Sequence, residues 1–173
     1  MACNRKVVLG VVAALVALLA LLYGHLKFYD WLNYERPAAL FSAVRNNDIA
    51  KIDLCLKHGA NIESYETYGW HSENKADTPL TMAIKTSSSD TVGHLLKRGA
   101  DPNRKWGGSG ESTPAVKAAI RGDVTIIELL RDAGADFSIG PKDLTPLQAA
   151  IRCKHEDAAS AIRKILEGKR PEK

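Results

Sequence analysis

Residues 112–136 read STPAVKAAIRGDVTIIELLRDAGAD, and this stretch decides the fold. It opens with Thr-Pro and closes with Gly-Ala-Asp, and both ends recur elsewhere in the chain. The recurring elements are Thr78-Pro79, Thr113-Pro114 and Thr145-Pro146, and Gly59-Ala60-Asn61, Gly99-Ala100-Asp101 and Gly134-Ala135-Asp136. In both complete copies the Thr and the Gly are 21 positions apart (99 − 78 and 134 − 113). The chain is therefore built from an internal repeat.

Four copies of this unit follow one another. The same distance back from Gly59 reaches Ala38, so the copies start at positions 38, 78, 113 and 145, with spacings of 40, 35 and 32 residues. Periods near this length are typical of repeat proteins, in which one unit cannot bury its apolar faces alone and stacks on its neighbours.

Each copy predicts two short antiparallel helices. The Thr hydroxyl can cap the first helix, and the Pro after it lacks an N–H that the first helical position does not need. A face of small and aliphatic residues follows: Leu40, Ala43 and Val44; Leu80, Ala83 and Ile84; Ala115, Ala118 and Ala119; Leu147, Ala150 and Ile151. In the polar turn, Asp48, Asp90 or Asp123 can cap the second helix. The closing Gly ends the second helix because it adopts a left-handed backbone without strain.

This pattern resembles the ankyrin repeat over about residues 38–166. The resemblance implies an all-α repeat solenoid of about four ankyrin repeats, at about 38–66, 78–105, 113–139 and 145–166, with residues 167–173 as a flexible tail. The family has His after Thr-Pro-Leu, but here that position holds Phe41, Thr81, Val116 and Gln148. We therefore expect the His-mediated bonding to be absent and these turns to be less rigid.

The last copy is expected to form a C-terminal cap. Its second helix carries charged residues where the other copies would meet a further repeat. These residues are Glu156, Asp157, Arg163 and Lys164.

The N-terminal part predicts a membrane anchor. Val7 to Tyr23 contains no charged residue and no Pro, and its 17 residues (23 − 7 + 1) reach the short end of a transmembrane helix. Residues 1–6 carry Arg5 and Lys6, which favours a cytosolic N-terminus and, in a bacterium, a periplasmic repeat domain. Residues 24–37 form a juxtamembrane segment with aromatic residues suited to the membrane interface. A cleaved signal peptide, giving a secreted form, is the alternative interpretation.

Aromatic residues gather in the two longer loops between copies. The expected protein-binding residues are Tyr65, Tyr68, Trp70 and His71 in the first loop and Trp106 in the second. Aromatic side chains are frequent anchors in protein interfaces. The alternative is that they fold back and cover the helices.

The sequence indicates no catalytic, cofactor or metal site. Cys55 with His58 and Cys153 with His155 supply only two candidate ligands each, whereas a zinc site needs four. We expect buried cysteines with free thiols, beside surface histidines. Net charge is +4, and Lys and Arg alternate with Asp and Glu along the chain, which argues against nucleic-acid binding. A small-molecule substrate is not expected either.

These observations predict a membrane-tethered ankyrin module that mediates protein–protein interaction and is not an enzyme. The chain resembles small bacterial membrane-associated ankyrin proteins. A sharper hypothesis is an immunity protein that neutralises a cognate antibacterial toxin or secreted effector, such as a phospholipase. The alternatives from other classes are an enzyme, or a lipid or nucleic-acid binder acting through the basic C-terminal tail.

Overall fold

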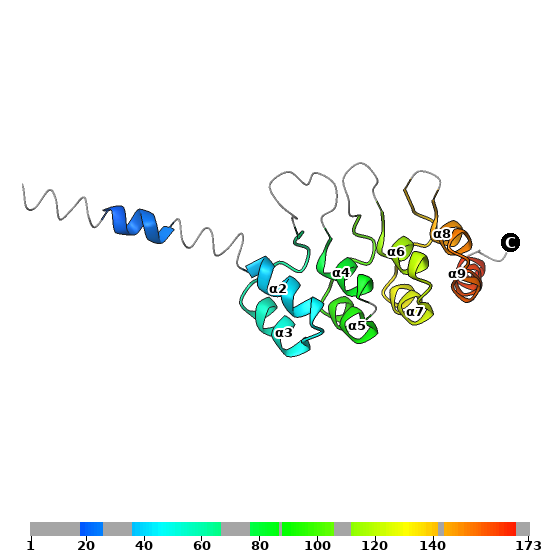
Figure 1. The fold of residues 1–173 in the computed structure, drawn as a ribbon, viewed down its shortest axis with the longest axis horizontal. Helices are drawn as coiled ribbons and strands as arrows, with labels where there is room; N and C mark the ends of the chain where they lie inside the picture. The colour runs from blue at the N-terminus through cyan, green and yellow to red at the C-terminus, as the bar shows by residue number, and fades with distance from the viewer. Residues whose placement is uncertain are drawn as a thin grey trace, which may run out of the picture. The chain divides into compact units, whose positions relative to one another are not determined.

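The computed structural model describes residues 18–25, 36–66, 77–86, 88–105, 112–141 and 144–168 (Figure 1). The chain divides into two compact units, residues 1–36 and 37–173. In the first unit, residues 18–25 are helical, and Leu18, Leu19, Leu21 and Leu22 are each more than half exposed. Among the described residues, no helix has the length and apolar character needed to cross a bilayer. Residues 7–17 of the predicted anchor lie outside the described residues.

The second unit consists of helix pairs placed side by side, as Figure 1 shows. The first helices of the pairs form one layer and are called the inner helices: α2 (Arg36–Arg45), α4 (Pro79–Lys85), α6 (Pro114–Arg121) and α8 (Pro146–Arg152). The second helices form the other layer and are called the outer helices: α3 (Ile49–Lys57), α5 (Ser89–Lys97), α7 (Val124–Asp132) and α9 (Glu156–Gly168). The described bases of the connections between pairs, residues 61–66, 101–105 and 136–141, lie on one side of the layers and are called the hairpin bases (Figure 1). The predicted helix pairs of the four copies are confirmed.

The three Thr-Pro elements begin inner helices as predicted. The hydroxyls of Thr78, Thr113 and Thr145 accept hydrogen bonds from the backbone N–H three residues later, at 3.2–3.4 Å. Pro occupies the first turn in each of these helices. A Thr cap satisfies one of the backbone donors that a helix start leaves without a partner.

The caps of the outer helices follow the prediction in two copies and differ in one. Asp48 and Asp123 cap α3 and α7, with carboxylate oxygens 3.0 and 3.1 Å from the N–H groups that they accept from. In the second copy, Ser88 is the cap of α5, and the prediction of Asp90 as the cap is wrong. The polar turn of this copy is longer, so Asp90 falls inside the first turn, where its negative charge faces the positive end of the helix dipole.

The closing glycines end the outer helices of the first three copies. Gly59, Gly99 and Gly134 have φ angles of 85°, 91° and 85°, which is the left-handed region. The Ala after each Gly donates its N–H back to the carbonyl five residues earlier in the outer helix, at 2.9–3.0 Å. The same hydrogen bond therefore closes the outer helix in the first three copies.

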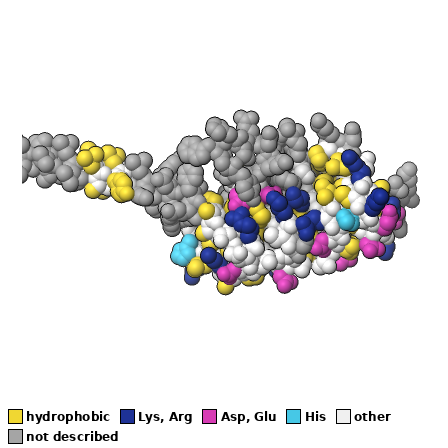
Figure 2. Space-filling view, viewed as in Figure 1, with side chains coloured by type: hydrophobic (Ala, Val, Ile, Leu, Met, Phe, Trp, Pro, Cys, Tyr) yellow, Lys and Arg dark blue, Asp and Glu magenta, His cyan; other side chains and the backbone are white. Residues whose placement is uncertain are grey.

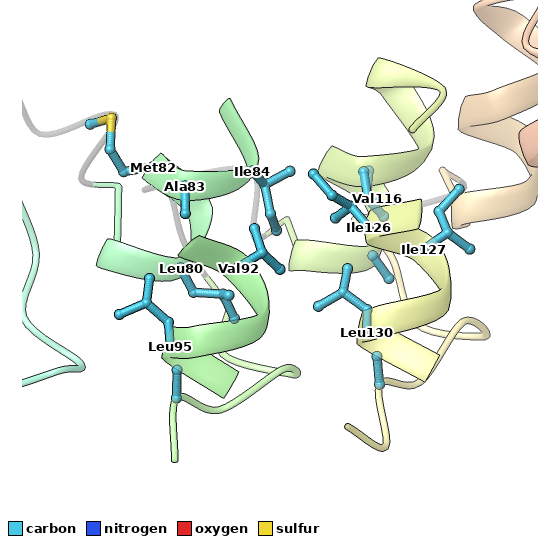
Figure 3. Close-up of a cluster of buried hydrophobic side chains, with 14 of the residues drawn as sticks. Leu80, Met82, Ala83, Ile84, Val92, Leu95, Val116, Ile126, Ile127 and Leu130 are labelled. Atoms are coloured by element: carbon cyan, nitrogen blue, oxygen red, sulfur yellow. The ribbon is translucent and has the colours of Figure 1, made fainter. Parts of the chain in front are cut away.

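The core lies between the pairs. Figure 3 shows Leu80, Ile84, Val92 and Leu95 of α4 and α5 opposite Val116, Ile126, Ile127 and Leu130 of α6 and α7. Leu95, Ile126 and Leu130 have no exposed surface. Each pair thus buries its aliphatic side chains against its neighbours, as the stacking of repeats requires.

The last pair ends the stack with an exposed, charged outer helix. Glu156, Asp157, Arg163 and Lys164 are all exposed on α9. In contrast, Ile151 of α8 is 45% exposed, whereas Ile84 at the corresponding place in α4 is fully buried. Ile84 is covered by the next repeat. Among the described residues no further repeat covers Ile151, so its apolar side chain is partly exposed.

Candidate protein-binding site

The bases of neighbouring hairpins are joined by hydrogen bonds. The side chains that form them lie two residues after the Gly-Ala-Asn or Gly-Ala-Asp element that closes each copy. Glu63 Oε1 accepts from the N–H of Asp101 at 2.8 Å. Asn103, at the same place in the next copy, accepts from the N–H of Asp136 at 2.7 Å and donates to the carbonyl of Gly134 at 3.2 Å. Each side chain reaches the following hairpin, so the hairpin bases are held in a fixed register.

Tyr65 is the one predicted binding residue within the described part of the chain, and it contacts the next hairpin. Arg104 donates from Nε to the Tyr65 hydroxyl at 2.9 Å, and its guanidinium carbon lies 5.4 Å from the ring centroid. The Tyr65 hydroxyl donates in turn to the carbonyl of Lys105, at 3.4 Å. The bond to Tyr65 raises the pKa of Arg104 further above its usual range, so Arg104 remains a cation. Tyr65 is 38% exposed and thus has a structural contact and a free face.

The other predicted binding residues, Tyr68, Trp70, His71 and Trp106, lie outside the described residues. The structure therefore brings Tyr65 together with Arg104 and Lys105, and the hypothesis about the remaining aromatic residues stays a prediction.

The base of the first hairpin carries two carboxylates next to two inner helices. Glu66 donates its N–H to the carbonyl of Asp77 at 2.9 Å, which closes the two sides of the hairpin. Glu66 forms an ion pair with Arg45 of α2. Asp77 is 2% exposed and pairs with Nζ of Lys85 at 3.1 Å. The side chains of Arg45 and Lys85 are still 43% and 49% exposed, so both contribute positive charge to the surface.

Acidic residues of the paired helices are confined to the outer layer, whereas basic residues lie in both layers. The inner helices contain no Asp or Glu, and each ends in a basic residue; these four residues are Arg45, Lys85, Arg121 and Arg152. The outer helices carry all the helical carboxylates, which are Asp53, Asp90, Glu128, Asp132, Glu156, Asp157 and Glu167. Figure 2 shows Lys and Arg side chains in a band across the middle of the repeat domain, with most acidic side chains of that view below it.

Sequence reasoning missed this basic row, although its signal is present in the register of the copies. The residue seven positions after the start of a copy is Arg45, Lys85, Ile120 or Arg152. Alternation of charge along the chain masked it, because the acidic residues of the helices lie only in the outer layer, whereas basic residues lie in both layers.

An exposed isoleucine interrupts the row in the third copy. Ile120 is 41% exposed on α6, beside Arg121. The His155 ring bonds through Nε2 to the carbonyl of Ile120 at 3.1 Å and lies directly over Gly122. His155 thereby fixes the end of α6 against the turn that leads into α9.

On the outer layer, each repeat contacts the one before it through the residue five positions before its closing Gly. In the second copy this residue is His94, whose Nε2 lies 2.6 Å from Asp53 Oδ1, which also accepts from Arg98 at 2.7 Å. In the third copy it is Leu129, whose side chain lies beside Gly93. In the first copy it is Leu54, which is 54% exposed.

The contact of Asp53 with His94 and Arg98 changes the pKa of Asp53. The hydrogen bond from His94, followed by that from Arg98, lowers the pKa of Asp53 below its usual range despite some opposing burial. The pair does not extend to a nucleophile: in the described part of the chain, no hydroxyl or thiol is hydrogen-bonded to the His94 ring.

The described residues contain no group of three His, Cys, Asp or Glu side chains that could hold a metal ion. Cys55 and Cys153 are free thiols, as predicted. Cys55 is half-buried and Cys153 is exposed, so the expectation of buried cysteines is wrong for Cys153, which follows the last residue of α8 at an exposed turn.

Comparisons with known proteins agree with the fold. The ankyrin repeat family matches residues 76–106. The 2-5A-dependent ribonuclease of Homo sapiens is 39% identical over 89 residues, which is 50% of this chain and 11% of that protein. The Mus musculus 2-5A-dependent ribonuclease is 36% identical over 88 residues, with the same shares.

A protein of fowlpox virus (strain NVSL), described by its name as an ankyrin repeat protein, is 37% identical over 134 residues, covering 76% of this chain and 21% of that protein. The chain thus spans about a tenth to a fifth of the lengths of these relatives. The capped helix pairs, their stacking and these matches identify the chain as an ankyrin-repeat protein.

Proposed function

We propose that this chain is a membrane-tethered module that captures a protein partner on its hairpins and inner helices. The observation that carries the proposal is the fixed register of the hairpins, in which Glu63 and Asn103 bond each hairpin base to the next. A surface whose bases are already ordered loses little conformational freedom on binding, which favours affinity.

The aromatic residues of the hairpins are the proposed anchors. The first two connections hold Tyr65, Tyr68, Trp70, His71 and Trp106, and Tyr65 presents a partly exposed ring at a hairpin base. Large aromatic side chains supply much of the binding energy in protein interfaces.

Capture by these anchors is tested with the full chain solubilised in detergent. The variant carries Trp70→Ala and Trp106→Ala, and the matched control carries Phe137→Leu, a conservative change in the core. We expect the double variant to lose the partners that the unmodified chain retains, with an unchanged helical circular dichroism spectrum. Retention of the same partners would contradict the proposal, and a large loss of helical signal would assign the two tryptophans to the fold.

The tether is proposed from the apolar run Val7–Tyr23. Within it, the leucines of residues 18–25 are exposed on a helix, where a hydrocarbon environment would stabilise them. We further propose a cytosolic N-terminus and a periplasmic repeat domain, because Arg5 and Lys6 precede the run. A tether concentrates the module at one surface and raises its effective concentration toward a partner there.

A reporter enzyme that is active only outside the cytosol, fused after Lys173, tests the orientation in a bacterial host. Activity is expected, and inactivity together with a positive signal from a cytosolic reporter would reverse the orientation. Carbonate extraction of the membranes tests the tether, since a cleaved form would be released into the soluble fraction. An immunity role predicts that cells producing the chain survive when the captured partner is delivered to the periplasm as a toxin. If these cells die as readily as cells without the chain, the immunity role is ruled out.

A further inference from the structure

We propose that Arg104, held in place by Tyr65, binds a carboxylate of the partner protein where the first two hairpin bases meet. This inference rests on the proposed function, because it names the chemistry of the partner that the module captures. It begins from a guanidinium group that one neighbouring hairpin base orients through a single edge.

Tyr65 of the first hairpin base orients Arg104 of the second. Arg104 donates from Nε to the Tyr65 hydroxyl at 2.9 Å, and the guanidinium carbon lies 5.4 Å from the ring centroid. The same hydroxyl donates to the carbonyl of Lys105 at 3.4 Å, so the second hairpin base in turn holds the tyrosine. An arginine that is already ordered loses less side-chain freedom on binding than an unrestrained one.

The bond to Tyr65 uses the Nε edge of the guanidinium group and leaves its terminal edge for another ligand. In the described part of the chain, neither terminal nitrogen of Arg104 donates a hydrogen bond. The side chain is 43% exposed. Two adjacent terminal N–H groups match the two oxygens of a carboxylate, which they bind in a bidentate arrangement. A carboxylate would therefore approach Arg104 end-on.

The two carboxylates near Arg104 are engaged by backbone groups. Glu63 Oε2 lies 3.8 Å from Arg104 Nε, too far for a hydrogen bond, and Glu63 Oε1 accepts from the N–H of Asp101 at 2.8 Å. Asp101 Oδ1 accepts from the N–H of Asn103, also at 2.8 Å. These carboxylates therefore favour the charged form of Arg104 without taking its terminal nitrogens.

The ring of Tyr65 adds an apolar contact beside this cation. Tyr65 is 38% exposed, and its hydroxyl already both accepts and donates a hydrogen bond. What it offers a partner is therefore the aromatic carbon surface. A protein segment that carries Asp or Glu next to an aliphatic or aromatic residue fits both groups. Tyr and Arg are also enriched among the residues that dominate binding energy in protein interfaces.

The surrounding charges favour an isolated carboxylate over a nucleic acid. Duplex DNA carries a phosphate charge about every 1.7 Å along its axis, so neighbouring phosphates would meet Glu63 and Asp101 when one of them reached Arg104. Like charges brought together in an interface oppose association. A single acidic residue flanked by neutral ones meets Arg104 without that repulsion.

The test uses a library of random short peptides displayed on phage and the full chain solubilised in detergent. Peptides that bind the Arg104→Gln variant are removed first, and the remainder is selected on the unmodified chain. We expect the selected peptides to share an Asp or Glu beside an apolar residue. Replacing that acidic residue by Asn or Gln should weaken binding by at least about tenfold, because a charge-assisted bidentate contact is lost.

Matched variants separate the geometry of the site from its charge. Arg131→Gln makes the same charge change on an outer helix, where the side chain is 45% exposed and bonded to Asp132, and should leave peptide binding unchanged. Arg104→Lys keeps the charge but lacks the paired terminal N–H groups, so it should bind the peptides nearly as weakly as Arg104→Gln. Melting temperatures of all variants check that they remain folded.

The role of Tyr65 in positioning Arg104 is tested by a double-mutant cycle. Tyr65→Phe removes the hydroxyl and keeps the ring, so it should weaken the acidic peptides by about three- to tenfold, the effect of one hydrogen bond. The same change should have little effect on the Asn or Gln versions of these peptides, because the hydroxyl acts through Arg104. Equal losses for both versions would show that Tyr65 does not act through Arg104.

Three outcomes would overturn the inference: no peptide remaining after removal on Arg104→Gln, selected peptides that do not need their acidic residue, or equal losses in Arg104→Gln and Arg131→Gln. The proposed function is judged separately, from the partner captured through Trp70 and Trp106. A captured protein that binds the Arg104→Gln variant undiminished leaves that function intact and removes this inference.

Discussion

The side chain of Asn103 joins two neighbouring hairpins through two hydrogen bonds. Its amide accepts from one backbone N–H and donates to one backbone carbonyl of the next hairpin, so both of its polar ends are used. Ser138, two residues after the closing element of the third copy, bonds instead to Asp136 within its own turn. The same position thus joins repeats only where a further hairpin follows it in the described chain.

Replacing Asn103 by Ala is expected to lower the free energy of unfolding by about 1 kcal/mol, the usual net value of such hydrogen bonds. Urea unfolding followed by circular dichroism measures it. The control is Ser138→Ala, which removes a bond within one turn and should cost less. An Asn103→Ala variant as stable as its parent would show that these two hydrogen bonds do not stabilise the contact between the hairpins.

The Asp53–His94 contact predicts a pH dependence. Asp53 has a lowered pKa in the folded state, so its stabilising effect is present above the unfolded value of about 4 and is lost as pH falls through the folded value. Asp53→Asn should therefore reduce the melting temperature at neutral pH, and the difference from the parent should shrink below about pH 4. Asp132→Asn, which affects a pair within one helix, is the control. A difference that stays constant down to the acid limit would contradict this linkage.

The residues that stand where the ankyrin family has a histidine make other contacts in this chain. Thr81 and Gln148 bond through their side chains to the N–H of the capping Thr, at 2.7 and 2.8 Å, and complete a reciprocal capping box. At these two helix starts another side chain thus takes the position of the family histidine and bonds to the backbone. Phe41 at the same position is buried in the core and contributes packing instead.

At the scale of elements, two glycines have opposite roles. Gly122 ends α6 with φ 73°, and a Cβ there would lie 2.5 Å from the His155 ring. Gly93 lies within α5, and a Cβ there would meet Leu129 at 3.7 Å, an ordinary contact. The first glycine is required by its backbone and its neighbour, whereas the second is tolerated.

Gly122→Ala is therefore expected to destabilise the domain by about 1–3 kcal/mol, from the left-handed backbone and the clash. Gly93→Ala should stabilise it by up to about 1 kcal/mol, because Ala favours a helix interior. Thermal unfolding of the two variants side by side checks both signs. Equal effects would mean that the contact between His155 and Gly122 is not maintained in solution.

The sequence predicted the helices and their caps more completely than the arrangement of charged and aromatic side chains on the surface. Thr caps, closing glycines and aliphatic faces are local signals repeated in register, so four helix pairs follow from them. The cap at Ser88 was missed because the longer turn of that copy offers several capping residues within three positions. The basic row was missed because it depends on which helices share a layer, and Tyr65 gained a partner 39 residues away in Arg104.

At the scale of the whole molecule, stability should be unevenly distributed. Leu95 lies in α5, in a pair with a further pair on each side, whereas Ile162 lies in α9 of the last pair (Figure 1). Both side chains are fully buried, and Leu95→Ala and Ile162→Ala are each expected to cost about 2–5 kcal/mol. Hydrogen exchange should show loss of protection across all pairs for the first variant and mainly in α8 and α9 for the second. Uniform loss in both would indicate that the stack unfolds as one unit.

The open joints at the two ends of the repeat stack have a consequence for how such a chain can grow. Leu54 on the outer layer of the first repeat is 54% exposed, and Ile151 on the inner layer of the last repeat is 45% exposed, whereas Ile84, the counterpart of Ile151 in the second repeat, is fully buried. A tandem duplication of the last unit would cover Ile151 in the way that Ile84 is covered, without any other change in sequence. Each duplication would also add one inner helix and one hairpin, so the number of copies sets the area of surface that a partner protein can meet.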